Sequence, residues 1–294
     1  MNFRDILDRY NIPYIAEGHE HCRPGWLQLD CPNCSPNSGR WRLGYNLAHH
    51  YTNCWQCGRV DLLRFFETVT GASRTETRQA LAGIIRERAA SRPRGTLKLP
   101  AGVGELLPAH TRYLRSRGFD PGALVKLWGL GGIGLAKELQ WRVFIPIHLY
   151  GDVVSWTTRS ISDEHSTRYR SAAATDEAIP HKTILYGEDY ARHTAIVVEG
   201  PVDAWAGGPG VVGTCGTGFS QSQVARLARY ATRVVCFDNA ADARKRSREL
   251  AMALSAFPGK TYEAEIDAKD LAEDLQRTGG KEIKQLRKHF LRDT

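Results

Sequence analysis

The chain has 294 residues, of which 42% are hydrophobic and 24% are charged, as in an ordinary soluble globular protein. No stretch approaches the roughly 18 apolar residues needed to span a bilayer, and the first residues lack the apolar core and the cleavage site of a signal peptide. These features argue against a membrane-spanning or exported chain, and we expect a cytoplasmic protein.

Positive charge is concentrated in the first half of the chain. The formal net charge is +8; residues 1–130 hold 18 Lys and Arg against 11 Asp and Glu, whereas residues 131–294 hold 22 against 21. A basic front half indicates contact with a polyanion. A basic surface that serves only solubility is the alternative.

Two cysteine pairs follow a helix that we expect within residues 1–20. Cys31 and Cys34 are separated by 19 residues from Cys54 and Cys57, and short strands are expected between the pairs. Two such turns supply four thiolates in the tetrahedral arrangement that zinc prefers, and four sulfur ligands leave no open position. The spacing therefore predicts one structural zinc ion. The alternative ligands nearby are His19, His21, Cys22, His49 and His50.

Aromatic and basic side chains surround the cysteine pairs. Exposed aromatic rings mixed with Arg and His suit stacking on unpaired bases and contact with phosphates. The candidates for contact with nucleic acid are Trp41, Arg42, Tyr45, His50 and Tyr51. The alternative is that some of these rings form the small core of the ribbon.

The middle of the chain predicts helices, a linker and a hairpin. Apolar residues at helical spacing predict one helix that ends on Gly71 and another over about 75–90. A stretch rich in Arg, Pro and Gly then forms the linker. A helix at 111–119 precedes a hairpin over 141–161, in which Pro146 predicts an edge strand or a bulged one.

The last third alternates apolar strands with amphipathic helices. Strands are expected at 194–199, 210–214, 233–238 and 261–266, with a helix after each and a long helix at the C-terminus. This alternation indicates an α/β fold with a mostly parallel sheet covered by helices on both faces.

Acidic residues follow three of these strands. Glu199 follows "AIVV", Asp238 follows "VVCF", and Asp270 comes a few residues after the last strand, with Glu273 and Asp274 nearby. The carboxyl ends of parallel strands meet at one edge of a sheet, so these side chains are expected to converge. A convergent set indicates divalent metal ions and their phosphate ligands, whereas a single acid there is more often a helix cap.

Several segments resemble one family of enzymes. "VVEGPVDAW", "CFDNAADARKR" and "AKDLAEDL" resemble the three acidic motifs of a Toprim domain. Upstream, "WRVFIPIHLYGDVVSWTTRSI", "TRYRSA" and "HKTILYG" resemble the catalytic core of DnaG-type primases, which also open with a zinc ribbon of this kind. The likeness covers almost the whole chain in the expected order, and the short form is most similar to stand-alone primases of phages or other mobile elements.

The resemblance implies a fold and an activity. The fold is an N-terminal zinc ribbon joined to a primase core with a parallel Toprim sheet covered by helices. The activity is that of a DNA-directed RNA polymerase of the primase type, a nucleotidyltransferase that makes short RNA primers on single-stranded DNA during DNA replication. Its implied cofactors are structural zinc and catalytic Mg²⁺ or Mn²⁺. Its implied partners are the template, ribonucleoside triphosphates and a separate replicative helicase.

Residue roles and domain bounds follow from the same resemblance. Glu199 matches a metal-linked acid/base residue, and Asp238 and Asp270 match metal ligands, with Glu273 as a further ligand. The residues that match phosphate-binding positions are Arg142, Arg159, Arg168 and Lys182, and those that match tight turns beside the metals are Gly200 and Gly216. The implied domains are the zinc ribbon at 1–70, a helix and linker at 71–107, a basic subdomain at 108–190, and the Toprim subdomain with the C-terminal helix at 191–294.

Position 240 departs from the family pattern. The second motif of the family has an acid two residues after its leading aspartate, and here Ala240 stands there, with Asp242 as the nearest replacement. Alanine cannot ligate a metal ion. Two alternatives therefore stay open beside the primase: a catalytically weakened nucleic-acid-binding protein, and a Toprim nuclease.

Overall fold

The computed structural model describes residues 2–91, 95–162, 167–216 and 218–291. The chain divides into two compact units: residues 1–93 with the turn at 150–152 form the first, and residues 94–149 and 153–292 form the second. The boundary at 93–94 lies inside the segment that the sequence assigns to a helix and linker. Among the helices of the described residues, none combines the length and the apolar character that crossing a membrane requires.

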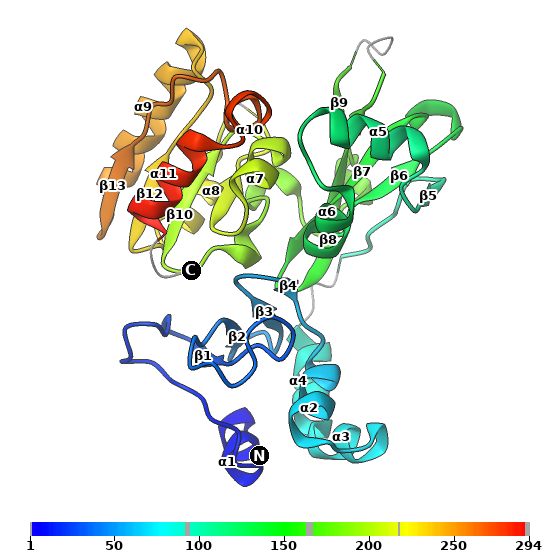
Figure 1. Ribbon diagram of the computed structural model, residues 1–294, viewed down its shortest axis with the longest axis vertical. Coiled ribbons are helices and arrows are strands. Elements are labelled where there is room, and N and C mark those ends of the chain that lie inside the picture. Colours follow the sequence, from blue (N-terminus) through cyan, green and yellow to red (C-terminus); the bar gives the residue numbers. More distant parts are fainter. Residues whose placement is uncertain (1, 92–94, 163–166, 217, 292–294) are drawn as a thin grey trace. The chain divides into compact units, whose positions relative to one another are not determined.

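The first unit contains helix α1 (Phe3–Arg9) and a small antiparallel sheet. Its strands pair in the order β1-β2-β3-β4 (Figure 1), with bounds Trp26–Leu29, Leu43–Asn46, Thr52–Cys54 and Gly58–Arg59. Three helices follow: α2 (Leu62–Thr70), α3 (Arg74–Ala80) and α4 (Ala82–Ser91). Both cysteine pairs therefore lie at strand ends or in the turns between strands.

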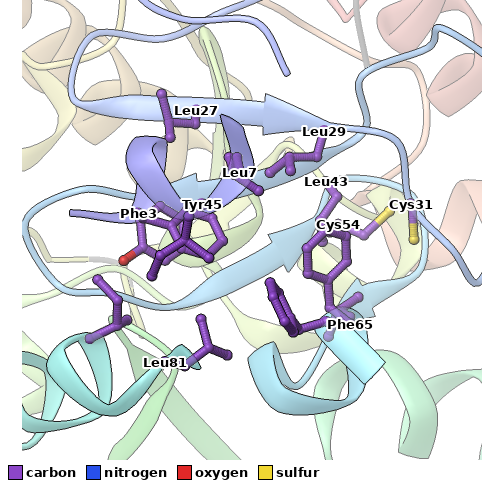
Figure 2. Close-up of a cluster of buried hydrophobic side chains, with 14 residues drawn as sticks. Phe3, Leu7, Leu27, Leu29, Cys31, Leu43, Tyr45, Cys54, Phe65 and Leu81 are labelled. Carbon is purple, nitrogen blue, oxygen red and sulfur yellow. The ribbon is translucent and has the colours of Figure 1, made fainter. Parts of the chain in front are cut away.

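One hydrophobic cluster joins the helices of this unit to its sheet (Figure 2). Phe3 of α1 stacks on Tyr45 of β2 with ring centroids 3.8 Å apart, and Phe65 of α2 packs into the same cluster. Cys31 and Cys54 are buried members of this cluster. The cysteine site and the core of the unit are thus continuous.

Local signals explain where the helices of the first unit begin and end. The Asp61 side chain accepts a hydrogen bond from the backbone N–H of Arg64 at 2.9 Å and so caps α2. Gly71 ends α2 as predicted, at φ 70°, a left-handed conformation that glycine adopts without strain. The expectation of one helix over about 75–90 is wrong: the chain leaves the helical conformation at Leu81, whose side chain is buried in the core.

The second unit holds a five-stranded sheet and a four-stranded sheet. The five strands pair in the order β5-β6-β7-β8-β9, with bounds Val103–Gly104, Gly131–Ile133, Arg142–Leu149, Asp152–Ser160 and Tyr169–Ser171. Helices α5 (Pro108–Ser116) and α6 (Pro121–Trp128) connect the first two strands. Four short 3₁₀ helices lie around and after this sheet: η1 (Lys137–Leu139), η2 (Ala174–Asp176), η3 (His181–Thr183) and η4 (Glu188–Tyr190).

Pro146 lies in an interior strand of this sheet. β7 has β6 on one side and β8 on the other, so the expectation of an edge strand is wrong. β6 pairs with β7 only over residues 142–144, and Pro146 lies beyond that segment. The missing N–H of the proline therefore costs no bond to β6. The predicted hairpin is confirmed: Tyr150 and Gly151, at φ 55° and 77°, turn the chain between β7 and β8.

The four-stranded sheet is parallel and has the order β11-β10-β12-β13. In chain order the strands are β10 (Thr194–Val198), β11 (Val211–Gly213), β12 (Thr232–Val235) and β13 (Lys260–Glu263). The helices between and after them are α7 (Pro201–Gly207), α8 (Gln221–Leu227), α9 (Ala241–Ser255), α10 (Leu271–Thr278) and α11 (Lys281–Phe290). This confirms the predicted α/β class with a parallel sheet.

Alternate side chains of the parallel sheet face two helical layers. Val197 and Val235 belong to the buried cluster that includes side chains of α8 and α9. On the other face Gly207 of α7 meets Val211 so closely that an added Cβ would lie 2.4 Å from the valine. Helices α7, α10 and α11 contact one another, and in Figure 1 α7 and α11 lie in front of the strands.

The single long C-terminal helix that the sequence predicts is two helices. Gly279 and Gly280, at φ 69° and 78°, separate α10 from α11. The buried Asp274 accepts hydrogen bonds from the Thr278 hydroxyl at 2.5 Å and from the Ile283 backbone N–H at 2.9 Å. Asp274 therefore connects the two helices.

Candidate functional site

Four cysteines of the first unit form a compact set of potential metal ligands. The Sγ atoms of Cys31, Cys34, Cys54 and Cys57 all lie within 4.8 Å of one another. Among the described residues, no other group of three or more Cys, His or acidic side chains has its ligand atoms so close together. Cys22 is not in it, since its thiol lies 3.2 Å from the Trp26 carbonyl. The predicted ligand set is the one that the fold brings together.

The thiols of this cluster interact with one another. Cys31 lies 3.5 Å from Cys57, and Cys34 lies 3.5 Å from Cys54. Hydrogen bonds from Cys54 and Cys57 lower the pKa of Cys31, so the cluster favours a thiolate at this position. Thiolates are the form that zinc binds. Four sulfur donors at these distances fit a tetrahedral zinc ion with no open position.

The aromatic candidates of the ribbon occupy different environments. Tyr45 is fully buried, and its hydroxyl lies 2.7 Å from Nδ1 of His50. Tyr51 is also buried, in a cluster with Trp26 and Trp55. Since their rings are covered, neither tyrosine offers a face for a base, and their predicted contact with nucleic acid is corrected to a role in the core.

Three of the ribbon candidates remain partly accessible. Trp41 and Arg42 are half-buried beside the start of β2. His50 is half-buried too, and its Nε2 lies 3.2 Å from Glu87. Burial lowers the pKa of His50. Contact of these three residues with nucleic acid stays a prediction.

A cavity of about 540 Å³ opens at the carboxyl edge of the parallel sheet in the second unit. Acidic and basic side chains line it together. The acidic lining residues are Glu199, Asp203, Asp238, Asp270 and Glu273, and the basic ones are Arg117, Arg159, Arg168 and Lys269. The cavity therefore has room and charge for an anionic ligand together with cations.

The three predicted acids come from three neighbouring strands. Glu199 follows β10, Asp238 follows β12, and Asp270 stands at the N-cap of α10 after β13. The Glu199 carboxylate accepts a hydrogen bond from the Asp238 backbone N–H at 3.4 Å. The Asp270 side chain accepts one from the backbone N–H of Glu273 at 2.7 Å. The parallel sheet brings these acids to one edge, and no close cluster like that of the cysteines forms among the described carboxylates.

The carboxylates raise each other's pKa. Burial raises the pKa of Asp238 to about 7, and the charges of Glu199 and Asp270 contribute to this shift. Burial also raises the pKa of Glu199, against the hydrogen bond from Asp238, and Asp270 raises it further. The negative charge of this edge is thus not neutralised by the neighbouring Lys269 and Arg246, although both lower the pKa of Glu199.

Sequence analysis missed one acid of this group, Asp203 of α7. Its pKa is raised to about 7, mainly by burial and then by Asp270 and Asp238. Its carboxylate accepts a hydrogen bond from the backbone N–H of Ala272 at 3.2 Å. The available signal was its position one helical turn after Glu199. An acid in the first turn of a helix is ordinarily attributed to the helix dipole, so the position of Asp203 did not mark it as a site residue.

Glu273 lines the cavity but is engaged with neighbouring residues. Its carboxylate accepts a hydrogen bond from the Lys269 backbone N–H at 2.7 Å and lies 3.4 Å from Arg277. The contact with Lys269 lowers the pKa of Glu273. Its role as a metal ligand stays a prediction.

Two of the four predicted phosphate-binding cations line the cavity. Arg159 is buried and donates to the hydroxyls of Tyr113 at 2.7 Å and Tyr169 at 2.6 Å. Arg168 is exposed at the cavity wall. Arg142 is not part of the lining. Its buried guanidinium donates to the carbonyls of Thr167 at 2.7 Å and Arg168 at 3.3 Å, so we correct its role to holding the Arg168 segment.

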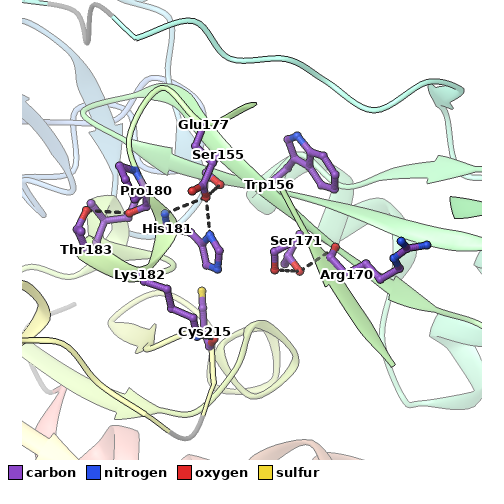
Figure 3. Close-up of polar contacts among 12 residues, drawn as sticks. Ser155, Trp156, Arg170, Ser171, Glu177, Pro180, His181, Lys182, Thr183 and Cys215 are labelled. Atoms are coloured by element: carbon purple, nitrogen blue, oxygen red, sulfur yellow. Dashed lines mark hydrogen bonds and ion pairs between the residues drawn. The ribbon is translucent and has the colours of Figure 1, made fainter. Parts of the chain in front are cut away.

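Lys182 lies beside the cavity without lining it. Its ammonium group donates a hydrogen bond to the carbonyl of Cys215, which is itself a lining residue (Figure 3). In the same network Glu177 accepts a hydrogen bond from the Ser155 hydroxyl at 2.5 Å and pairs with His181. Lys182 is thus held at the rim by a backbone contact, and its binding of phosphate stays a prediction.

Ala240 is exposed at the N-cap of α9, and no side chain caps this helix end. Asp242 lies in the first turn of α9, is exposed, and does not line the cavity in the described structure. It therefore does not replace an acid at position 240.

The residues around the cavity fit divalent metal ions. Glu199, Asp203, Asp238 and Asp270 supply the oxygen donors that Mg²⁺ and Mn²⁺ prefer. Burial, with a smaller contribution from neighbouring carboxylates, raises the pKa of three of them, and a bound cation would favour their ionised form. The basic side chains on the other walls suit the phosphates of a nucleotide.

No family model and no curated protein matches the sequence. Solved structures do resemble the fold. The zinc-binding and RNA polymerase domains of the Aquifex aeolicus primase match with a TM-score of 0.55 and 18% identity, over 99% of this chain and 83% of that chain. The DnaG catalytic core matches with a TM-score of 0.51 and 20% identity, over 63% of this chain and 74% of that one.

A third solved structure is the primase fragment of the bacteriophage T7 primase-helicase protein. It matches with a TM-score of 0.44 and 16% identity, over 89% of this chain and 99% of that one. Because this TM-score is below 0.5, the fold is assigned from the other two structures. The two stronger matches agree with the cysteine cluster and the parallel sheet described above. The chain therefore has the fold of the zinc-binding and RNA polymerase domains of DnaG-type primases.

Proposed function

We propose that this protein is a DNA primase that makes short RNA primers on single-stranded DNA by metal-dependent nucleotidyl transfer. The observation that carries the proposal is the cavity at the edge of the parallel sheet, where carboxylates from two strand ends and from the N-termini of α7 and α10 face Arg159 and Arg168. Such a site suits a triphosphate, its metal ions and a primer end. The primase-like fold supports the same reading.

In this proposal the acids and cations of the cavity have separate roles. Glu199, Asp203, Asp238 and Asp270 would hold Mg²⁺ or Mn²⁺, which lowers the negative charge of the triphosphate and of the leaving pyrophosphate. Arg168 and Lys269, which also line the cavity, would bind phosphate oxygens. Arg159 is positioned by two tyrosine hydroxyls and adds a fixed positive charge that the fold holds in place.

Glu199 is the candidate for proton transfer. Burial raises its pKa, which makes the carboxylate a stronger base toward the proton of a 3′ hydroxyl. It also accepts the Asp238 backbone N–H, which fixes its orientation at the edge of the sheet. It would act in the Toprim part of the chain as the acid/base residue.

The first unit would select the template. A zinc ribbon with half-buried Trp41 and Arg42 suits contact with unpaired bases. Ribonucleoside triphosphates are the proposed substrates and a separate replicative helicase the proposed partner. A phage or another mobile element in a bacterial cytoplasm is the proposed setting.

One observation favours a second function. Ala240 leaves the N-terminus of α9 without the acid that the family motif carries, and Asp242 does not fill its place. A protein with a weakened metal site would bind template and turn over slowly. A Toprim nuclease is less favoured, because the whole primase-like fold is present.

Primer synthesis on a single-stranded template tests the proposal. Labelled ribonucleotides, Mg²⁺ or Mn²⁺ and the full chain are expected to give short RNA products, and Glu199→Gln is expected to lower their yield at least about a hundredfold. Glu105→Gln, an exposed acid of the same unit outside the cavity, is the matched control. Template cleavage in place of synthesis would support the nuclease, and DNA binding without either reaction would support the weakened binder.

A further inference from the structure

Helix α9 carries a row of cations on the side that faces away from the sheet. Its buried side chains recur at helical spacing and pack toward β12, β13 and α8: Ala243, Ser247, Leu250 and Leu254. Arg244, Lys245 and Arg248 are exposed. We call these three residues the α9 basic face.

The fold makes no visible use of the α9 basic face. In the part of the chain that the structure describes, none of its three side chains has an ion pair or a hydrogen bond. Other arginines of the second unit are engaged: Arg226 lies 2.8 Å from Glu188, and Arg287 donates to the Gly207 carbonyl at 2.6 Å. The charges of α9 are therefore available to a ligand.

Two of these cations weaken the helix slightly. Arg244 lies near its first turn, where the positive end of the helix dipole disfavours a cation. Arg244 and Arg248 are also one turn apart, so their charges repel each other. Ala240 provides no side-chain cap that would offset this. Helix stability does not account for these arginines, whereas binding of a polyanionic ligand would.

The surface at these residues is concave. A shallow hollow on the outside of α9 is lined by Ala241, Arg244, Lys245, Arg248, Glu249 and Met252. A second, smaller hollow shares Arg244 and Arg248 and continues to Glu263 at the end of β13 and to Glu265 and Ile266 after it. The two arginines thus stand between both hollows.

We propose that the α9 basic face binds the phosphate backbone of single-stranded DNA that extends beyond the cavity. Arg244 and Arg248 are about 6 Å apart along the helix axis, so the two guanidinium groups can contact different phosphates of one strand. α9 begins at Ala241, three residues after Asp238, so the helix starts beside a strand end that lines the cavity, and a strand bound there can continue onto α9. The proposal rests on the proposed function, since it takes the template strand as the ligand.

An acidic protein partner fits this face less well. Protein interfaces have an apolar, charge-depleted centre, and Met252 is the one apolar side chain larger than alanine in the hollow. Guanidinium groups, in contrast, bind phosphate oxygens in a bidentate manner. Nucleic acid is therefore the ligand that the observations favour.

Binding of fluorescein-labelled oligo(dT) to the full chain, followed by anisotropy over a range of salt concentrations, tests the proposal. Each phosphate contact on a single strand contributes about 0.7 to the slope of log K against log salt. Arg244→Gln with Arg248→Gln is therefore expected to reduce the slope by about 1.4 and to weaken binding about tenfold or more at low salt. Glu249→Gln, which removes an acid from the same hollow, is expected to tighten binding.

The matched control is Lys281→Gln with Lys284→Gln, two exposed cations on α11 of the same unit. It removes equal charge and should leave the slope within about 0.3 of the original value. An unchanged slope in the α9 variant, or an equal loss in the control, would overturn the proposal. Because the readout is binding alone, it stands apart from primer synthesis: a protein without polymerase activity would still show the α9 effect.

Discussion

Ala240 occupies a position where a side chain would have two separate effects. It is exposed and extended, with φ −95° and ψ 151°, and it precedes the first turn of α9. A polar residue here would accept a hydrogen bond from the N-terminal backbone N–H groups of the helix. An acid here would also stand two residues from Asp238, at the edge where the carboxylates gather. Stability and activity at this position therefore have to be separated.

We expect Ala240→Asp to raise primer synthesis at limiting Mg²⁺ or Mn²⁺ by about tenfold, because a further carboxylate strengthens the metal site. Ala240→Ser is the matched control: it caps the helix without adding a charge. Both substitutions should stabilise the protein by about 1 kcal/mol, but only the aspartate should change the metal dependence. Equal rates for the native chain and the Ala240→Asp variant at every metal concentration would show that no ligand is missing.

The raised pKa values of Asp203 and Asp238 predict how stability depends on pH. Both values are about 7 in the folded protein and about 4 in an unfolded chain. Between these values the folded state binds more protons than the unfolded state, so the metal-free protein should lose stability as the pH rises from 4 through 7. Thermal unfolding in buffer without Mg²⁺ or Mn²⁺, and without a chelator that would also remove zinc from the first unit, should show Tm falling across this window.

Substitution and metal addition both check this assignment. Asp238→Asn removes one of the titrating groups and should flatten the dependence of Tm on pH. Saturating Mg²⁺ should raise Tm by more at pH 8 than at pH 5, because deprotonated carboxylates bind the ion. A Tm that rises from pH 5 to pH 8 without Mg²⁺ or Mn²⁺ would contradict the raised pKa values of these buried acids.

At the scale of elements, the ribbon depends on its cysteines more than on its short strands. Cys31 and Cys54 are buried in the same cluster as Phe3 and Phe65, so a metal ion at this site would hold the sheet and the helices together (Figure 2). Strands of two to four residues bury too little surface to be stable alone. Zinc binding would supply part of the folding energy of the first unit.

We expect one zinc ion per chain, and we expect Cys54→Ser to unfold the first unit while the second stays folded. Limited proteolysis should then remove roughly the first 90 residues and leave a stable fragment of the second unit. Cys22→Ser, which changes a buried thiol outside the cluster, is the control and should retain zinc. Pure reduced protein without zinc would disprove the assignment.

At the scale of the whole molecule, the cysteine site and the acidic cavity lie in different units. The basic residues 1–130 extend from the first unit into the second, and their excess positive charge predicts that affinity for single-stranded DNA falls steeply with salt. The candidate catalytic cavity lies wholly in the second unit. Template choice and chemistry should therefore be separable.

A chain without residues 1–94 should lose its preference for particular start sequences and keep residual primer synthesis. The missing part contains the zinc site, whereas Glu199, Asp238 and Asp270 remain. Sequencing the 5′ ends of the primers made by the full and shortened chains measures this. Identical start sites in both would show that the ribbon does not read the template.

Local patterns were enough to predict much of the fold. The alternation of apolar strands with helices predicted the parallel sheet, because strands buried on both faces must be apolar throughout. The spacing of the cysteines predicted the metal site, because ligands on two tight turns need little else to converge. Acids at strand ends predicted the edge with Glu199, Asp238 and Asp270, because parallel strands end on one side.

Only the tertiary structure decided which side chains share an environment. Asp203 joins the acids because α7 packs against α10, and Arg142 leaves the cavity because its guanidinium meets the Thr167 carbonyl. Tyr45 is buried by α1, a segment about 40 residues away. The sequence by itself determined the element types and the ligand spacing, which depend on near neighbours. Burial, hydrogen-bond partners and the raised carboxyl pKa values depend on segments that are distant in the sequence. Only the packing of the folded chain brings these segments together.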